Sequence, residues 1–287
     1  MTSLTRSVSR VLYPRRRTRL AIMLSAPMGW LVLAYLGSLA ALLLTSLYSV
    51  DDFTSEVVKD RLTTANLSDV VTNPLYRTVM LRSIGIAAAV TVIDLVIAVP
   101  VGFYMAKIAA PKARRLLVVG LLMPLWASYL VKAYVWRALL DPEGGLFHRV
   151  FGVSPGFGLG GVIIVLAYLW LPYMILPIYT GFERLPDSLL EASADLGGRG
   201  KVTFRKVLLP LVVPSLAAGS IFTFSLSLGD YIAAGLVGGK VRVLGNLIYG
   251  TFGRPNYPLA SAIALIPVVV MIVYLLAVRR SGALENL

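Results

Sequence analysis

The stretch GFERLPDSLLEASADLGGRGKVTFRKVLLPLVVPSL, residues 181–216, lies between two long apolar runs. Pro186 and Asp187 form a helix start signal, and the Asp187 carboxylate is the expected N-cap. Gly197 and Gly198 are expected to end this helix, because glycine accepts the left-handed backbone that is common after a helix. The pattern predicts a surface helix over 188–196 and a second helix from Lys201 into the next apolar run. Such a surface helix can dock into a groove on another protein.

The composition around this stretch is typical of a membrane protein. Apolar residues make up 57% of the 287 residues and charged residues 14%, although the formal net charge is +13. Soluble proteins contain about 25% charged residues, so a soluble enzyme or a soluble nucleic-acid binder does not fit. The chain has no cysteine, which excludes disulfides and thiolate metal sites. Its single histidine, His148, has no obvious partners for a metal site, so we expect no bound metal.

Long runs with few or no charges predict the membrane spans, since a spanning helix needs about 20 apolar residues. Four runs contain no Asp, Glu, Lys or Arg: 20–50, 150–182, 207–229 and 255–278. The sequence therefore predicts an all-α membrane protein with six transmembrane helices, at 22–48, 79–106, 116–139, 159–181, 208–230 and 259–278. The domain limits that follow are a basic N-terminal arm (1–21), a transmembrane domain (22–281) and a tail (282–287). Residues 51–77 are expected to form a loop or a surface helix.

The distribution of basic residues predicts the orientation of the chain. An even number of spans places both termini on one side, together with the loop 182–209. That side carries 17 of the 27 basic residues and five of the 14 acidic ones. Because cytoplasmic loops are rich in Lys and Arg, both termini are expected in the cytoplasm of a bacterial cell, with the helices in its inner membrane. The excess of positive charge is thus explained by topology and lipid contact, without a nucleic-acid partner.

The loop that follows the fourth predicted span resembles the EAA loop of ABC-importer permeases. Glu191-Ala192-Ser193, then Gly197, then Val207-x-Leu209-Pro210 match the family pattern in every spacing, with Ser for Ala and Val for Ile. The resemblance implies the type I (MetI-like) permease fold and a helix that couples the chain to an ATPase. It further implies roles for the coupling residues: a polar anchor (Glu191), packing contacts (Ala192 and Leu196), a turn (Gly197) and a break before the next span (Pro210), with Ser193 in the place of the second alanine. The alternative is that Glu191 only solvates a surface helix.

The resemblance also implies the partners. Two ABC ATPase subunits, a second homologous permease and an extracytoplasmic solute-binding protein would complete the transporter. The chain would be a transport subunit and not an enzyme, with ATP and magnesium on the ATPase subunits. Its own GGRGKVT segment fails the phosphate-loop pattern, because Asp195 replaces the first glycine and Val202 follows the lysine.

Two further segments resemble spermidine/putrescine permeases: MPLWASYLVKAYVWRALLDPEGGL (123–146) and SLSLGDYIAAGLVGG (225–239). This likeness implies a polyamine as the solute. Related permeases carry opines, amino-acid derivatives or phosphonates, which stay open as alternatives. A secondary transporter coupled to an ion gradient, with Asp94 as its ion site, is a further alternative.

Acidic and aromatic residues in or near the spans are the candidates for the substrate path. Asp94 is charged at the centre of a span, where such residues usually face a cavity or a partner. A salt bridge or a neutral acid would also explain it. Asp230 is expected either to receive a cation or simply to end a helix. The aromatic candidates for cation–π contacts, or otherwise for an interfacial belt, are Trp126, Tyr129, Trp136, Trp170 and Tyr173.

Overall fold

The computed structural model describes residues 16–51, 56–252, 256–280 and 282. Its long helices are α2 (Arg16–Ser46), α4 (Pro74–Phe103), α5 (Pro111–Trp126), α6 (Tyr129–Leu139), α8 (Leu159–Glu183), α11 (Leu209–Gly229) and α14 (Tyr257–Arg280). The short helices are α3 (Ala65–Thr72), α7 (Leu146–Phe151), α9 (Ser188–Asp195), α10 (Gly200–Thr203), α12 (Ile232–Val237) and α13 (Leu244–Phe252), with two π-helical segments, η1 (Tyr104–Ile108) and η2 (Phe204–Leu208). The predicted arm up to residue 15, and the predicted tail beyond residue 282, lie outside the described residues.

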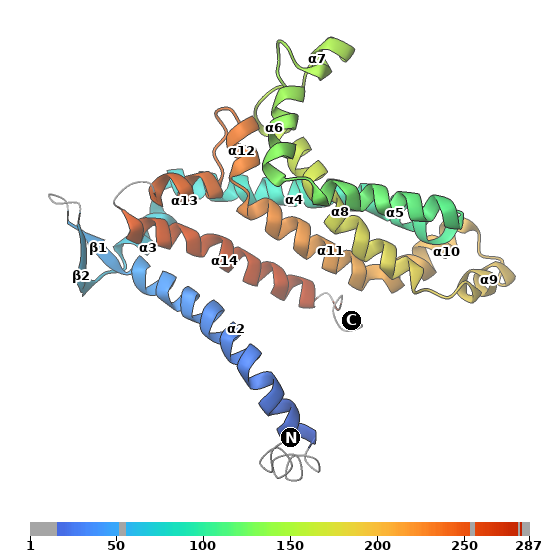
Figure 1. The fold of residues 1–287 in the computed structure, drawn as a ribbon, viewed down its shortest axis with the longest axis horizontal. Coiled ribbons are helices and arrows are strands. Elements are labelled where there is room, and N and C mark those ends of the chain that lie inside the picture. The colour runs from blue at the N-terminus through green and yellow to red at the C-terminus, as the bar shows by residue number, and fades with distance from the viewer. Residues whose placement is uncertain (1–15, 52–55, 253–255, 281, 283–287) are drawn as a thin grey trace, which may run out of the picture.

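Five helical stretches of the described chain are long and apolar enough to cross a membrane. They are Met23–Ser46, Pro74–Ile108, Leu159–Glu183, Gly200–Gly229 and Tyr257–Arg280. Each coincides with one of the predicted spans, which confirms a helical membrane fold with five to six spans. Figure 1 shows α9 and α10 at one end of the long axis and the two strands at the other. These are called the α9 end and the sheet end below.

The predicted helix 116–139 is not one straight span. It consists of α5 and α6, which meet at an angle of 96°. Ala127 and Ser128 between them have ψ values of 140° and 134°, so two residues of extended backbone turn the chain. Pro124 in the last turn of α5 has no N–H to donate, which weakens that turn and favours an end there.

The predicted loop 51–77 is largely regular structure. Strands β1 (Tyr48–Val50) and β2 (Val57–Leu62) pair antiparallel, and α3 follows them. Asn66 at the start of α3 donates from its side-chain amide to the carbonyls of Ser46 (2.9 Å) and Tyr48 (2.8 Å). The expected surface helix is therefore present as α3, while the two-stranded sheet is an addition to the expected all-α fold.

Three helices, α4, α8 and α11, form the centre of the bundle. Glycines set the spacing between them. A Cβ at Gly102 of α4 would lie 3.0 Å from the Ile178 side chain and 3.2 Å from the Tyr179 backbone nitrogen of α8. A Cβ at Gly219 of α11 would lie 2.8 Å from Met174 Sδ and 3.1 Å from its carbonyl oxygen. Only glycine allows both α4 and α11 to approach α8 this closely.

The helix predicted from Lys201 into the fifth span is observed. Helices α10, η2 and α11 form one stretch, Gly200–Gly229, which passes Pro210 without interruption. The break expected at Pro210 is replaced by the π-helical segment η2, which lies just before it. Leu209 donates its N–H to Phe204, five residues back, and Pro210 follows with no N–H to satisfy.

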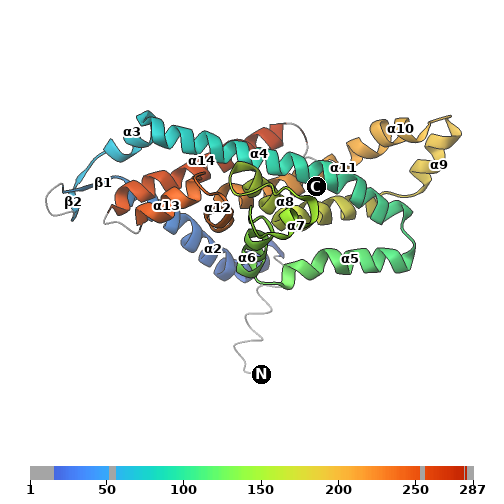
Figure 2. The ribbon, with the colours of Figure 1, turned by 90° about the horizontal axis from the view of Figure 1, so that it is seen from above.

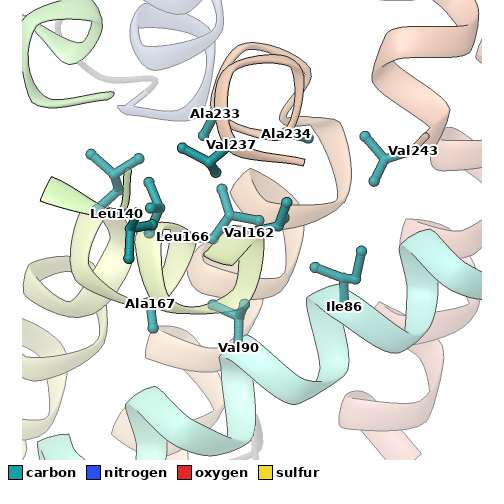
Figure 3. Packing of buried hydrophobic residues seen from close by; sticks show 12 residues of the cluster. Ile86, Val90, Leu140, Val162, Leu166, Ala167, Ala233, Ala234, Val237 and Val243 are labelled. Atoms are coloured by element: carbon teal, nitrogen blue, oxygen red, sulfur yellow. The ribbon is translucent and has the colours of Figure 1, made fainter. Parts of the chain in front are cut away.

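The short helix α12 packs on the sheet-end half of the bundle. Figure 3 shows Ala233 and Val237 of α12 beside Leu140, Val162 and other apolar side chains. These side chains form one buried cluster with residues of α4 and α8. The segment after α11 is thereby fixed against the bundle, and this positions Asp230.

Candidate docking helix and aromatic hollow

Helix α9 and its glycine turn protrude from one end of the molecule (Figure 2). Glu191, Ala192 and Leu196 are exposed, and Leu196 reaches 90% of its maximal exposure. Gly197 has φ = +79°, and Gly198 donates its N–H to the Ser193 carbonyl at 2.8 Å. The predicted helix and the predicted glycine stop are therefore observed. The exposed side chains, apolar Leu196 among them, suit a helix that docks on a partner.

Ser193 has a structural contact within this loop. Its hydroxyl lies 2.8 Å from the Thr203 hydroxyl of α10, across the glycine turn. The contact joins α9 to the start of the helix that continues as α11. Ser193 is half-buried, so it faces the loop interior while Glu191 and Ala192 face outward.

Asp187 does not cap α9, in contrast to the sequence prediction. Its backbone is already helical (φ −65°, ψ −23°), and its side chain makes no capping hydrogen bond. The carboxylate instead accepts a hydrogen bond from Lys107 Nζ at 2.6 Å. This hydrogen bond and the charge of Lys107 hold the pKa of the Asp187 carboxyl below its ordinary value. The side chain thus serves a long-range contact with η1.

A second acidic side chain near α9 has contacts from two elements. Glu183, at the end of α8, accepts a hydrogen bond from the Tyr179 hydroxyl at 2.7 Å. Its Oε1 lies 3.8 Å from Arg114 of α5, and Arg114 also donates to the Ala106 carbonyl at 2.8 Å. At the α9 end, α5 thus has a polar contact with the end of α8, and η1 has one with the connection that follows. Sequence reasoning assigned these basic residues to topology alone and missed the contacts.

The second candidate site is a hollow of ≈ 330 Å³ at the end of α11, called the aromatic hollow below. It is lined by Tyr129, Trp170, Ser225, Leu226, Gly229, Asp230, Tyr231 and Ile232. The Tyr129 and Trp170 rings stack with centroids 5.8 Å apart. Three of the predicted path residues, from α6, α8 and the end of α11, are thus brought together.

Asp230 is held in place from two sides. One carboxylate oxygen accepts a hydrogen bond from the Tyr129 hydroxyl, and the other accepts from the Ala233 N–H at 2.9 Å. Asp230 therefore ends α11 and also binds the first turn of α12, and it still lines the hollow.

The other predicted path residues lie elsewhere. Trp126 is 90% exposed at the bend between α5 and α6, and Trp136 packs against Phe147 and Tyr168. Tyr173 contacts Trp170 edge to face, so it adjoins the hollow without lining it.

Asp94 is completely enclosed within the subunit. Its exposure is 0%, and neither carboxylate oxygen has a hydrogen-bond partner among the described residues. The salt bridge considered from the sequence is thus not observed in the described part of the chain. In this conformation Asp94 does not reach the surface of the subunit.

Comparison with known proteins identifies the family. The family model described as "Binding-protein-dependent transport system inner membrane component" matches residues 98–284, which include α9 and the aromatic hollow. The chain belongs to this family. It is an inner-membrane permease subunit of an ABC importer, and this family transports solutes while separate subunits hydrolyse ATP. An ion-coupled secondary transporter does not fit this membership.

Similar permeases cover three quarters of the chain or more. The inner membrane ABC transporter permease protein YdcU of Escherichia coli (strain K12) is 41% identical, over 93% of this chain and 91% of its own length. The spermidine/putrescine transport system permease protein PotB of the same organism is 32% identical, over 90% of this chain and 96% of its own length. PotB of Haemophilus influenzae is 35% identical, over 75% of this chain and 78% of its own length.

Solved structures support the permease fold. A chain of a bacterial alginate ABC transporter in complex with its periplasmic protein superimposes with a TM-score of 0.74, at 13% identity, over 97% of this chain and 98% of that chain. A chain of the MetNI methionine ABC transporter superimposes with a TM-score of 0.58, at 19% identity, over 73% of this chain and 96% of that chain. The predicted MetI-like fold is thereby confirmed.

Proposed function

We propose that this permease forms half of the translocation path of an importer for polyamines such as spermidine and putrescine. A second homologous permease forms the other half, and an extracytoplasmic binding protein delivers the solute. Two ABC ATPase subunits bind the ATP and magnesium, and this chain binds no cofactor. Both termini lie in the cytoplasm, as the basic residues favour.

The observation that carries the choice of solute is the aromatic hollow. It combines one carboxylate, Asp230, with the stacked rings of Tyr129 and Trp170. Ammonium groups are attracted both by carboxylates and by aromatic faces, at about 0.5–2 kcal/mol for each ring. Opines and phosphonates carry negative groups, which a buried carboxylate repels. The two PotB relatives, named for spermidine and putrescine, support the same class of solute.

The coupling to ATP is assigned to α9. Glu191 is the polar anchor on the ATPase, and Ala192 and Leu196 supply packing contacts. The support for this assignment is the exposure of these residues at the tip of the molecule, together with the EAA-like spacing. A docked ATPase subunit would cover the apolar side chain of Leu196, which is 90% exposed in the single chain.

Transport by the reconstituted complex tests the proposal. The permease pair and the ATPase subunits are placed in liposomes with the binding protein outside and ATP inside, and uptake of labelled spermidine and putrescine is measured. We expect uptake that depends on ATP. Unlabelled polyamines are expected to reduce it by competition, and an opine or a phosphonate is expected to leave it unchanged. Uptake in which an anionic solute competes better than spermidine would refute the polyamine assignment.

A matched pair of variants tests the role of Asp230. Asp230→Asn keeps the size of the side chain and removes its charge, and we expect it to slow polyamine uptake at least tenfold. Glu143→Gln makes the same change on an exposed loop residue, and its uptake is expected to equal that of the unchanged protein. Equal uptake in both variants would exclude Asp230 from the path.

A further inference from the structure

The connection between α8 and α9 is held by a side chain from a different helix. After α8 ends at Glu183, four residues lead to α9. Lys107 of η1, at the end of the α4 span, reaches this connection from the side. Its Nζ donates to the Leu185 carbonyl at 2.5 Å and to Asp187 Oδ1 at 2.6 Å. The residues joined are about 80 positions apart in the chain, so the contact is set by tertiary structure.

Burial makes this contact asymmetric. The Lys107 side chain is 8% exposed, whereas the Asp187 side chain is 77% exposed. A lysine ammonium is costly to bury, and it is tolerated here because two oxygens accept its hydrogen bonds. The carboxylate by itself would be well solvated. The contact therefore differs from a surface ion pair, because the Lys107 ammonium is largely desolvated and also binds the Leu185 carbonyl.

Lys107 connects α9 to α4, a helix that is not its neighbour along the chain. Helix α9 follows α8 directly and leads through the glycine turn into α10 and α11. Among the polar contacts described above, Ser193 joins α9 to Thr203 of α10, and Lys107 joins the start of α9 to η1 at the end of the α4 span. The neighbouring contact from Arg114 to Glu183 acts on α8 before the connection begins. Lys107 thus holds the connection itself.

We propose that Lys107 is a positioning residue that makes α4 move with α9 when the ATPase subunits move α9. The inference rests on the proposed docking role of α9. Without the Lys107 contact, a displacement of α9 would pass to α8 and α11 through the chain, and the four-residue connection would absorb part of it. With the contact, all three central helices receive the displacement together. Leu190 of α9 also packs against the buried cluster that includes Met105 of η1, and Lys107 adds a directed polar contact to this apolar one.

Substitutions at the contact separate transport from ATP hydrolysis. In liposomes, the Lys107→Met complex is expected to retain its ATPase subunits. Solute-loaded binding protein is expected to stimulate their ATP hydrolysis as in the unchanged complex. Solute uptake per ATP hydrolysed is expected to fall about tenfold, the scale set by one hydrogen bond to a charged group. Lys107→Arg, which still donates to both oxygens, is expected to restore most of the uptake. The control is Lys112→Met, an exposed lysine of α5, which is expected to change nothing.

A distance measurement makes the test independent of the solute. Because the chain has no cysteine, spin labels can be attached at cysteines introduced for Asp195 of α9 and Val96 of α4. We expect the distance between the labels to stay constant between the ATP-free and the ATP-trapped complex, and to change once Lys107→Met is added. A distance that Lys107→Met leaves unaltered would overturn the proposal, as would full coupling in that variant. If the distances behave as expected but the unchanged complex takes up no polyamine, only the solute assignment is refuted.

Discussion

Replacement of Asp94 by leucine is expected to stabilise the permease. Asp94 lies within the α4 span, is 0% exposed, and has no partner for either carboxylate oxygen among the described residues. Leucine places two methyl groups where the two oxygens are now, so the shape of the side chain is largely kept. The substitution therefore removes an unsatisfied polar group from an apolar interior without leaving a cavity.

The expected gain follows from transfer energies. At the centre of a membrane helix, Asp costs about 2.5–3.5 kcal/mol and Leu contributes roughly −0.3 to −0.6 kcal/mol. The difference is about 3–4 kcal/mol, from which about 1 kcal/mol is lost to tighter packing of the larger side chain. A net gain of ~2–3 kcal/mol corresponds to an increase in the unfolding temperature of about 3–5 °C in a protein of this size.

Thermal unfolding of the purified permease complex, followed by circular dichroism, measures this change. The control is Val96→Leu, two residues further along α4, where the side chain is 67% exposed and the unfolding temperature is expected to stay the same. If Asp94→Leu and Asp94→Asn both unfold at a lower temperature than the unchanged protein, the carboxyl group has a stabilising partner. The reasoning from its orphaned oxygens would then be wrong.

Three other substitutions test separate contacts. Gly219→Val places a side chain against the Met174 backbone and is expected to destabilise the bundle by about 1–3 kcal/mol, seen as a lower unfolding temperature. Tyr129→Phe removes the hydroxyl that donates to Asp230, and we expect a severalfold rise in the solute concentration for half-maximal uptake, with unchanged ATPase co-purification. Glu191→Lys is expected to insert and fold normally, because the residue is exposed, and to lose the ATPase subunits during purification; retention of these subunits would count against the docking role.

Local patterns made most of the fold predictable. The span predicted at 159–181 is Leu159–Glu183 in the structure, and the helix predicted over 188–196 is Ser188–Asp195. Both follow from hydropathy and from glycine signals that act within a few residues. The bend between α5 and α6 was not predictable in this way, because hydropathy reports composition and not direction. The sheet was missed because β1 has only three residues at the end of the charge-free run 20–50, and because β2 carries Lys59, Asp60 and Arg61.

The candidate sites depend on contacts between distant parts of the chain. Sequence reasoning named Tyr129 and Asp230 separately, but nothing local indicated that they meet across 101 residues. The same limit explains the error at Asp187, whose local context suits a helix cap and whose actual partner is Lys107. A side chain with two possible partners is assigned only when the packing of the helices is known.

The separation of α6 from α12 in the chain has a consequence for biosynthesis. Arg137 of α6 donates to the Leu236 carbonyl of α12, which lies 99 residues later in the chain. Tyr129 donates to Asp230, which lies 101 residues later. At about 5–20 residues per second, a ribosome needs roughly 5–20 s to supply these partners. During that interval α6, which has only 11 residues, is too short to cross the bilayer alone. The polar contacts that fix α6 to α12 therefore form only after about four-fifths of the chain has been translated, and until then α6 has only its packing on α8.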